Sequence, residues 1–257
     1  MAAIPKGTGG ATRSTAAAAL RRSFDIYYRD RERMRRMDAV NAAFVGPGAR
    51  VFDIGAHVGD RVASFLRLGA AVVAAEPQPR VARALRLLYG RHQNVVLREA
   101  AVGAEPGHAT LYLNSRNPTV ATMSSDFVAA AADACGWRDQ VWDAEVEVET
   151  VTLDMLIAEY GMPDFIKIDV EGREDSVLAG LGHAVPALCF EVTTMQRAVA
   201  LRCLDRLAAL GPYTFNLSLG EEHRFQYTAW MGARRMARTI RALPDKANSG
   251  DVFARLP

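Results

Sequence analysis

The sequence predicts an α/β fold, in which helices alternate with the buried strands of a mostly parallel sheet. The first indication is residues 51–59, where a short apolar strand ends in an acid and is followed by a glycine-containing turn and the start of a helix. Apolar segments then alternate with segments of helical spacing, which is typical of parallel strands joined by helices. The chain has 257 residues, of which 50% are hydrophobic, and this is enough for one large domain with its own core.

The elements are expected in a simple order. Residues 1–15 should be a mobile leader, and residues 16–44 carry apolar side chains near helical spacing, which predicts one or two amphipathic helices over one end of the sheet. Strands are expected at residues 51–53, 71–75, 94–98, 164–169, 187–192, 214–217 and 252–256. Helices are expected at residues 60–68, 80–89, 153–160, 194–210 and 233–243.

An insertion is expected within the domain. Residues 107–113 and 145–151 alternate as β-strands do and should pair as a hairpin. Between them, residues 114–144 show no clear period, and an irregular segment of about 30 residues in a compact domain is more often a binding loop than filler. We therefore expect an N-terminal arm at residues 1–44 and a domain at residues 45–257, in which residues 114–145 form a substrate lid. The tryptophans Trp137 and Trp142 fit either the core of this lid or a substrate platform.

The turn after the first strand indicates which cofactor the chain binds. A dinucleotide fingerprint, G-x-G-x-x-G, would need glycines at positions 55, 57 and 60, whereas the chain has Gly55, His57 and Asp60. The diphosphate of NAD would lose two of the three glycines that let the backbone come close to it, and it would lie near the negative charge of Asp60. The pattern that is present, Asp53, Gly55 and Gly59, suits a ligand without phosphate whose amino group needs an acid and whose carboxylate needs backbone N–H groups. S-adenosylmethionine (SAM) is such a ligand.

Further acids follow the predicted strands at their carboxyl ends, the edge where α/β folds bind ligands. Glu76 lies about 20 residues beyond the turn, where an acid can hold the two hydroxyls of a ribose. An ordinary acid at a strand end is the alternative. Asp169 and Glu171 follow the predicted central strand, and the small residues at 99–103 leave room for an adenine ring. The predicted cofactor-binding residues are therefore Asp53, Gly55, Ala56, His57, Gly59, Asp60, Glu76, Pro77, Ala101 and Asp169.

The charge distribution limits the partners. The net charge is +2, but residues 1–40 carry +5 and the remainder carries −3. A basic arm can bind nucleic acid, yet acids are interleaved with these arginines, so a solvated helix face is the better explanation and no nucleic acid is predicted. No apolar run reaches the roughly 18 residues of a membrane span. The three cysteines have no metal or disulfide spacing, which predicts a reducing cytoplasm, and the oligomeric state stays open, a homodimer included.

Two charged residues lie within apolar strands. Lys167 and Glu191 are expected to pair across neighbouring strands, because an unpaired buried charge is costly. Asp169, Glu171 and Glu191 could supply oxygen ligands to Mg²⁺, but the sequence has no dedicated metal spacing, so no metal is predicted. His183 and His223 are expected at the surface.

The chain resembles the FkbM family of methyltransferases. Four segments carry the resemblance: residues 52–59 (FDIGAHVG), residues 75–77 (AEP), the stretch 152–172 that begins TLD and ends FIKIDVEG, and residues 189–192 (CFEV). The resemblance implies a seven-stranded class I methyltransferase sheet, Rossmann-like, with SAM as cofactor and usually a hydroxyl of a natural product or carbohydrate as the methyl acceptor. One departure is His57, because the family often has asparagine at this position.

A hydroxyl acceptor must lose a proton, so a general base is expected near the cofactor. The candidates for this catalytic role are Asp169, Glu171 and His57. Asp169 is better suited to holding the amino group of the methionine part of SAM. The alternatives are an N-methyltransferase, an RNA methyltransferase that uses the basic arm, and a protein that binds SAM without transferring its methyl group.

Overall fold

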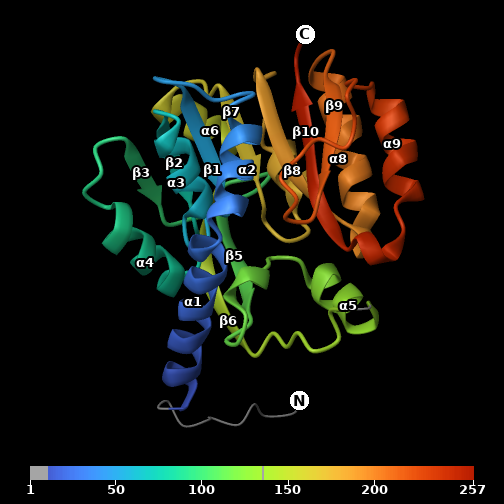
Figure 1. Ribbon diagram of the computed structural model, residues 1–257. Helices are drawn as coiled ribbons and strands as arrows, with labels where there is room; N and C mark the ends of the chain where they lie inside the picture. Colours follow the sequence, from blue (N-terminus) through green and yellow to red (C-terminus); the bar gives the residue numbers. More distant parts are fainter. Residues whose placement is uncertain (1–10, 135) are drawn as a thin grey trace.

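The structure is a computed structural model that describes residues 11–134 and 136–257 (Figure 1). The first ten residues of the expected leader lie outside this range. Residues 11–15 belong to helix α1 (Ala11–Arg29), so the expectation of a leader is wrong for them. Helix α2 (Arg31–Asn41) follows, and the Asp30 side chain caps it by accepting from the backbone N–H groups of Glu32 and Arg33. The amphipathic helices expected in this region are confirmed.

The strands of the main sheet match the prediction closely. In the described chain its order is β3 (Val95–Arg98), β2 (Ala71–Ala75), β1 (Arg50–Ile54), β7 (Phe165–Ile168), β8 (Ala187–Thr193), β10 (Ser249–Arg255) and β9 (Thr214–Leu219). The neighbours from β3 to β8 are parallel, whereas β10 runs antiparallel to β8 and β9. The mostly parallel seven-stranded sheet is therefore confirmed, and β7 lies beside β1 in it.

Both faces of this sheet are buried, which explains why its strands are almost continuous apolar runs. On one face, Phe52 and Phe190 pack with residues of α6 (Leu153–Tyr160), α7 (Glu174–Ala179), α8 (Arg197–Leu210) and α9 (Ala233–Ala242). On the other face, Val51 and Phe165 pack with residues of α2, α3 (Asp60–Arg67) and α4 (Pro79–Tyr89). Within the described residues, every helix is too short or too polar to cross a membrane.

A second, three-stranded sheet lies at the carboxyl end of the parallel strands, in the lower part of Figure 1. Its strands β5 (Gly107–Leu113) and β6 (Ala144–Val151) pair antiparallel, so the expected hairpin is confirmed. A short strand, β4 (Ala101–Val102), pairs parallel with β6. Part of the segment 99–103, whose small residues were expected beside the adenine ring, is therefore a strand.

The segment between β5 and β6 is more regular than expected. It contains the 3₁₀ helix η1 (Pro118–Val120) and helix α5 (Ser125–Asp133), which Ser124 caps by accepting from the backbone N–H group of Phe127. The Phe127 ring is fully buried and meets the rings of Trp137 and Trp142 edge to face. The two tryptophans therefore contribute to the core of the insertion, the first of the two interpretations open from the sequence.

Candidate active site

One pocket lies at the carboxyl ends of β1, β2 and β7, and segments far apart in the sequence enclose it. The turn after β1, the end of β2, the strand β4 and the acids after β7 form its wall, and Tyr27 and Arg33 of the N-terminal helices close one side. Most of the residues expected at the site line this pocket: Asp53, Gly55, Ala56, His57, Asp60, Glu76, Pro77, Ala101, Asp169 and Glu171. The sequence prediction therefore identified most of the wall that the sheet contributes.

Two glycines shape the turn for different reasons. Gly55 has a φ of 82°, and a Cβ atom there would lie 1.8 Å from the carbonyl oxygen of Asp169. Only glycine therefore allows the ends of β1 and β7 to come this close. Gly59, with a φ of 81°, precedes α3, and a Cβ atom there would lie 2.6 Å from the Tyr89 ring and 2.8 Å from Leu85. The structure thus places Gly59 at the contact with α4, outside the pocket wall.

The backbone N–H groups of the turn are largely used within the protein. Four of them donate to acceptors of the chain at 2.8–3.0 Å: those of Gly55, Ala56, His57 and Gly59. The expectation that they bind the carboxylate of a ligand therefore finds no support in this geometry. Positive charge comes instead from the N-terminus of α3 and from Arg33 and Arg61, which both line the pocket.

Glu76 is buried at the end of β2, with 3% of its surface exposed. Its carboxylate oxygens accept one hydrogen bond each, from the backbone N–H groups of His57 at 2.9 Å and Gln78 at 2.8 Å. Burial raises the pKa of Glu76 to about 7, and the two backbone N–H groups offset part of this effect. A carboxylate has about four acceptor positions, so Glu76 keeps acceptor capacity for two ligand hydroxyls.

Two further acids flank the turn. Asp53 is 1% exposed, and its Oδ2 atom has no hydrogen-bond partner within the described chain. Burial raises the pKa of Asp53 to about 7, although the nearby Arg61 opposes the shift. Asp60 is bound instead, because its Oδ2 atom lies 3.0 Å from a guanidinium nitrogen of Arg33. Asp53 therefore keeps a buried oxygen without a partner, whereas Asp60 is held in an ion pair.

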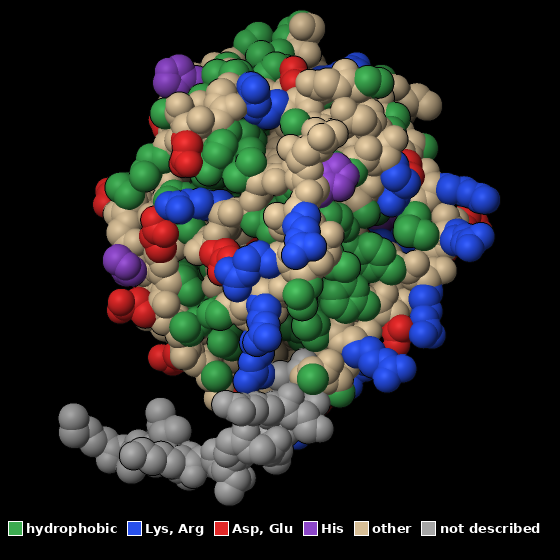
Figure 2. Space-filling model, turned by 90° about the vertical axis from the view of Figure 1, so that its left-hand side faces the viewer, with side chains coloured by type: hydrophobic (Ala, Val, Ile, Leu, Met, Phe, Trp, Pro, Cys, Tyr) green, Lys and Arg blue, Asp and Glu red, His purple; other side chains and the backbone are tan. Residues whose placement is uncertain are grey.

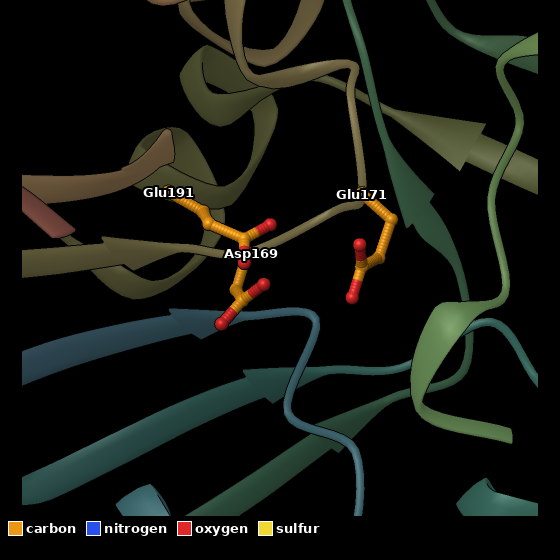
Figure 3. Close-up of side chains that lie close together, drawn as sticks. All are labelled: Asp169, Glu171 and Glu191. Carbon is orange, nitrogen blue, oxygen red and sulfur yellow. The ribbon is translucent and has the colours of Figure 1, made fainter. Parts of the chain in front are cut away.

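Three carboxylates converge beyond the end of β7 (Figure 3). Oxygen atoms of Asp169, Glu171 and Glu191 lie within 4.8 Å of one another. Glu171 is 7% exposed, has a φ of 54°, and uses its carbonyl oxygen to accept a hydrogen bond from Thr122 of the insertion at 2.6 Å. Burial and the neighbouring acids, Asp169 above all, raise the pKa of Glu171 well above its usual value.

The expected pair of Lys167 and Glu191 is wrong. The Lys167 Nζ atom lies 2.6 Å from Asp251 Oδ1 and 3.2 Å from Asp169 Oδ2. Burial alone would lower the pKa of Lys167, but Asp169 and Asp251 raise it above its usual value, so the side chain stays charged. The partner was missed because Asp251 belongs to β10, the last strand in the chain, which the fold inserts next to β8.

The histidines named from the sequence have different surroundings. His57 lies in the wall with a φ of 45°, its ring meets the Tyr27 ring edge to face, and its Nε2 atom is without a partner in the described structure. Burial lowers the pKa of His57, which keeps the ring neutral near pH 7. His223 was expected at the surface but is buried, with its Nε2 atom 3.0 Å from Glu221. His183 is exposed, as expected.

Comparison with known families decides the identity of the chain. Residues 53–211 match the model of the methyltransferase FkbM domain. The chain belongs to the FkbM methyltransferase family. A comparison with curated proteins found no match. The resemblance in the sequence is thus confirmed, and this FkbM protein is a SAM-dependent methyltransferase.

Solved structures similar to this FkbM methyltransferase show low sequence identity. An O-methyltransferase from Bacillus cereus in complex with SAH has a TM-score of 0.47 and 10% identity, over 99% of this chain and 94% of that chain. The O-methyltransferase TomG from Streptomyces achromogenes has a TM-score of 0.44 and 10% identity, over 97% and 91%. A precorrin-6y C5,15-methyltransferase from Geobacter metallireducens has a TM-score of 0.43 and 13% identity, over 86% of each chain.

The pocket of the FkbM methyltransferase fits SAM on the side formed by the sheet. Asp53 has a free oxygen for an amino group, Glu76 has acceptor capacity for the ribose hydroxyls, and Gly55 allows close approach. The opposite side of the pocket contains residues that the sequence did not single out: Tyr27, Arg33, Arg61, Thr119, Met123 and Glu221. Thr119 and Met123 belong to the insertion that was expected as a lid, whereas Tyr27, Arg33 and Glu221 lie in segments without a recognisable motif.

Proposed function

We propose that this FkbM methyltransferase methylates a hydroxyl group of a small molecule, either a natural product or a carbohydrate. The observation that carries the proposal is the group of three carboxylates in the wall of the pocket that also contains Glu76. A hydroxyl loses its proton when its oxygen is methylated, so proton acceptors beside the cofactor serve this reaction.

The roles on the cofactor side follow from the free acceptor positions. Glu76 is proposed to hold the ribose hydroxyls, and Asp53 and Asp169 to hold the amino group of the methionine part. Ala101, whose small side chain lines the pocket, leaves room for the adenine ring. When bound, SAM supplies the methyl group from its sulfonium.

The remaining residues align the acceptor and take its proton. Alignment of the hydroxyl in a cleft that excludes water can supply much of the catalysis. The Glu171 Oε2 and His57 Nε2 atoms lack hydrogen-bond partners in the described part of the chain, and we assign the proton to one of them. Glu171→Gln and His57→Asn should therefore lower kcat more than they raise the Kd for SAM.

The arm and the insertion are proposed to cover the acceptor. Tyr27 of α1 and Thr119 and Met123 of the insertion line the pocket, and Arg22 donates a hydrogen bond to the carbonyl oxygen of Arg116 at 2.6 Å. This contact joins α1 to the insertion. The division into an arm at 1–44, a domain at 45–257 and a lid at 114–145 belongs to this proposal.

Nucleic acid as an acceptor has less support than a small molecule. Arg33 of the arm pairs with Asp60 and Glu221, and Arg36 pairs with Glu32, so these arginines are not free for phosphates. On the face that Figure 2 shows, basic side chains are scattered among apolar and acidic ones. A reducing cytoplasm is the proposed location, because Cys189 and Cys203 are buried free thiols.

Isotope-labelled SAM tests the acceptor class. The enzyme should transfer label to a compound in pools of small metabolites, and mass spectrometry should find the new methyl group on oxygen. Transfer to RNA that weakens steeply with salt, or to nitrogen, would replace the proposal with one of the alternatives. Binding of SAM without transfer to any pool would favour a non-catalytic protein.

A further inference from the structure

We propose that Asp169, Glu171 and Glu191 bind one divalent metal ion of the kind that prefers oxygen ligands, such as Mg²⁺. The sequence has no dedicated metal spacing, and the fold alone brings these residues together. Asp169 and Glu171 follow β7, and Glu191 belongs to the neighbouring strand β8.

The spacing of the carboxylates fits a common ion. Ca²⁺ binds oxygen at about 2.3–2.6 Å and Mg²⁺ at about 2.0–2.1 Å, so two ligand oxygens on one ion lie no more than about 5 Å and about 4 Å apart. One oxygen from each of the three side chains lies within 4.8 Å of the others, so the larger ion fits directly and Mg²⁺ fits after a small inward movement of the side chains. Figure 3 shows the three side chains reaching into the same space from their separate strands and loops.

The free oxygens of the cluster are a second observation that points to a ligand. Glu171 is 93% buried, and its Oε2 atom has no hydrogen-bond partner among residues 11–134 and 136–257. The Oε2 atom of Glu191 is likewise buried without a partner in these ranges. Buried carboxylate oxygens normally have hydrogen-bond partners. Two such oxygens that lack a partner and face the same space therefore indicate a bound ligand that coordinates oxygen, such as a cation.

The charges within the protein do not neutralise the cluster. Lys167 reaches Asp169, but it also pairs with Asp251 at the shorter distance of 2.6 Å, and Asp251 is shared further with Arg61 at 3.5 Å. Glu171 and Glu191 form no ion pair within the described residues. A divalent cation would supply the two positive charges that this arrangement lacks.

The position of the ion would define the acceptor more closely. The three carboxylates line the pocket, so an ion held by them keeps its remaining coordination positions toward the pocket. Such an ion can bind the acceptor hydroxyl together with a neighbouring oxygen, as in a diol or a hydroxyl next to a carbonyl group. With Asp169 and Glu171 bound to the ion, the proton of the hydroxyl goes to His57 Nε2, and Asp53 holds the amino group of SAM. This last step rests on the proposed function, whereas the metal site itself does not.

Titration of the purified chain with Mn²⁺, followed by electron paramagnetic resonance of the free ion, tests the site without an acceptor. We expect one site in the presence of SAH, and competition by Mg²⁺. Glu171→Gln and Glu191→Gln should each weaken Mn²⁺ binding by about 10- to 100-fold or more, since changes beyond the ligands already have effects of this size. The control Glu149→Gln, at an exposed ion pair with Arg98, should bind Mn²⁺ as the wild type does.

The proposal is refuted if no Mn²⁺ binds at millimolar concentration with or without SAH, or if both site variants retain the binding. A second measurement needs no variant, because Mn²⁺ in this site should broaden the proton resonances of bound SAH. Unbroadened resonances at saturating Mn²⁺ would also refute the proposal. If the metal binds but no hydroxyl is methylated, the metal site stands and the proposed function fails.

Discussion

Substitution of Glu76 tests the cofactor side of the pocket most directly. Glu76 already accepts hydrogen bonds from the backbone N–H groups of His57 and Gln78, and we expect its remaining acceptor positions to bind the ribose hydroxyls. Hydrogen bonds to a charged group contribute about 1.5–3 kcal/mol each, and the carboxyl is only partly ionised near its pKa of about 7. Glu76→Ala should therefore weaken SAM binding by about 1–3 kcal/mol, or about 5- to 150-fold in Kd.

The same carboxyl predicts how SAM affinity changes with pH. Folding raises the pKa of Glu76 from 4.5 to about 7 and therefore favours the protonated carboxyl. As the pH rises from about 4.5 to 7, Glu76 consequently lowers the free energy of unfolding of the free protein. Ribose hydroxyls donate to the ionised form, so SAM affinity should change in the opposite direction. Between pH 8 and pH 6 the ionised fraction falls about tenfold, and the contribution of Glu76 to SAM affinity should fall by about the same factor.

Calorimetric titration with SAM at pH 6 and pH 8 separates this effect from others. Asp53 also has a pKa of about 7 and adds its own pH dependence, so the informative quantity is the difference between the wild type and Glu76→Gln. From pH 8 to pH 6, the Kd for SAM should rise about tenfold more in the wild type than in Glu76→Gln. Equal SAM affinity in the wild type and both variants, or equal pH dependence, would refute the assignment of Glu76 to the ribose.

Three other substitutions test the structure around the site. Gly55→Ala places a Cβ atom 1.8 Å from the carbonyl oxygen of Asp169 and should abolish SAM binding in calorimetry. The control Gly48→Ala, with the same φ of 82° and no atom within 4 Å of its Cβ position, should leave SAM binding intact. Equal effects of the two substitutions would contradict the argument from close approach. Lys167→Met leaves Asp169 without its cation and Asp251 with only the more distant Arg61, and it should lower the free energy of unfolding by about 3–5 kcal/mol in urea. An unchanged value would mean that the buried ion pairs of Lys167 have no net effect on stability. Phe127→Ala removes the ring at the centre of the insertion, at a cost of about 3–5 kcal/mol, and should raise the KM for the acceptor more than the Kd for SAM; an equal rise in both would count against a lid.

The sequence was informative wherever a local pattern determines a local structure. Alternation of apolar segments located the strands of the main sheet, and the run from Asp53 to Gly59 located the turn, because both depend on neighbouring residues. The pairing of Lys167 could not be predicted in this way. Its partner Asp251 lies 84 positions further along the chain, on a strand that enters the sheet between β8 and β9.

The pocket residues outside the family match were not predicted, for a related reason. Tyr27 and Arg33 precede residues 53–211, which match the family model, and Glu221 follows them. Arg33 joins these regions, because its guanidinium lies 2.7 Å from Glu221 and 3.0 Å from Asp60 at the start of α3. The contact depends on three segments that are far apart in the sequence, and only the one with Asp60 belongs to a motif. Tyr27, Arg33 and Glu221 lie outside the matched region, so this part of the pocket wall can differ between relatives that keep the same turn and the same Glu76.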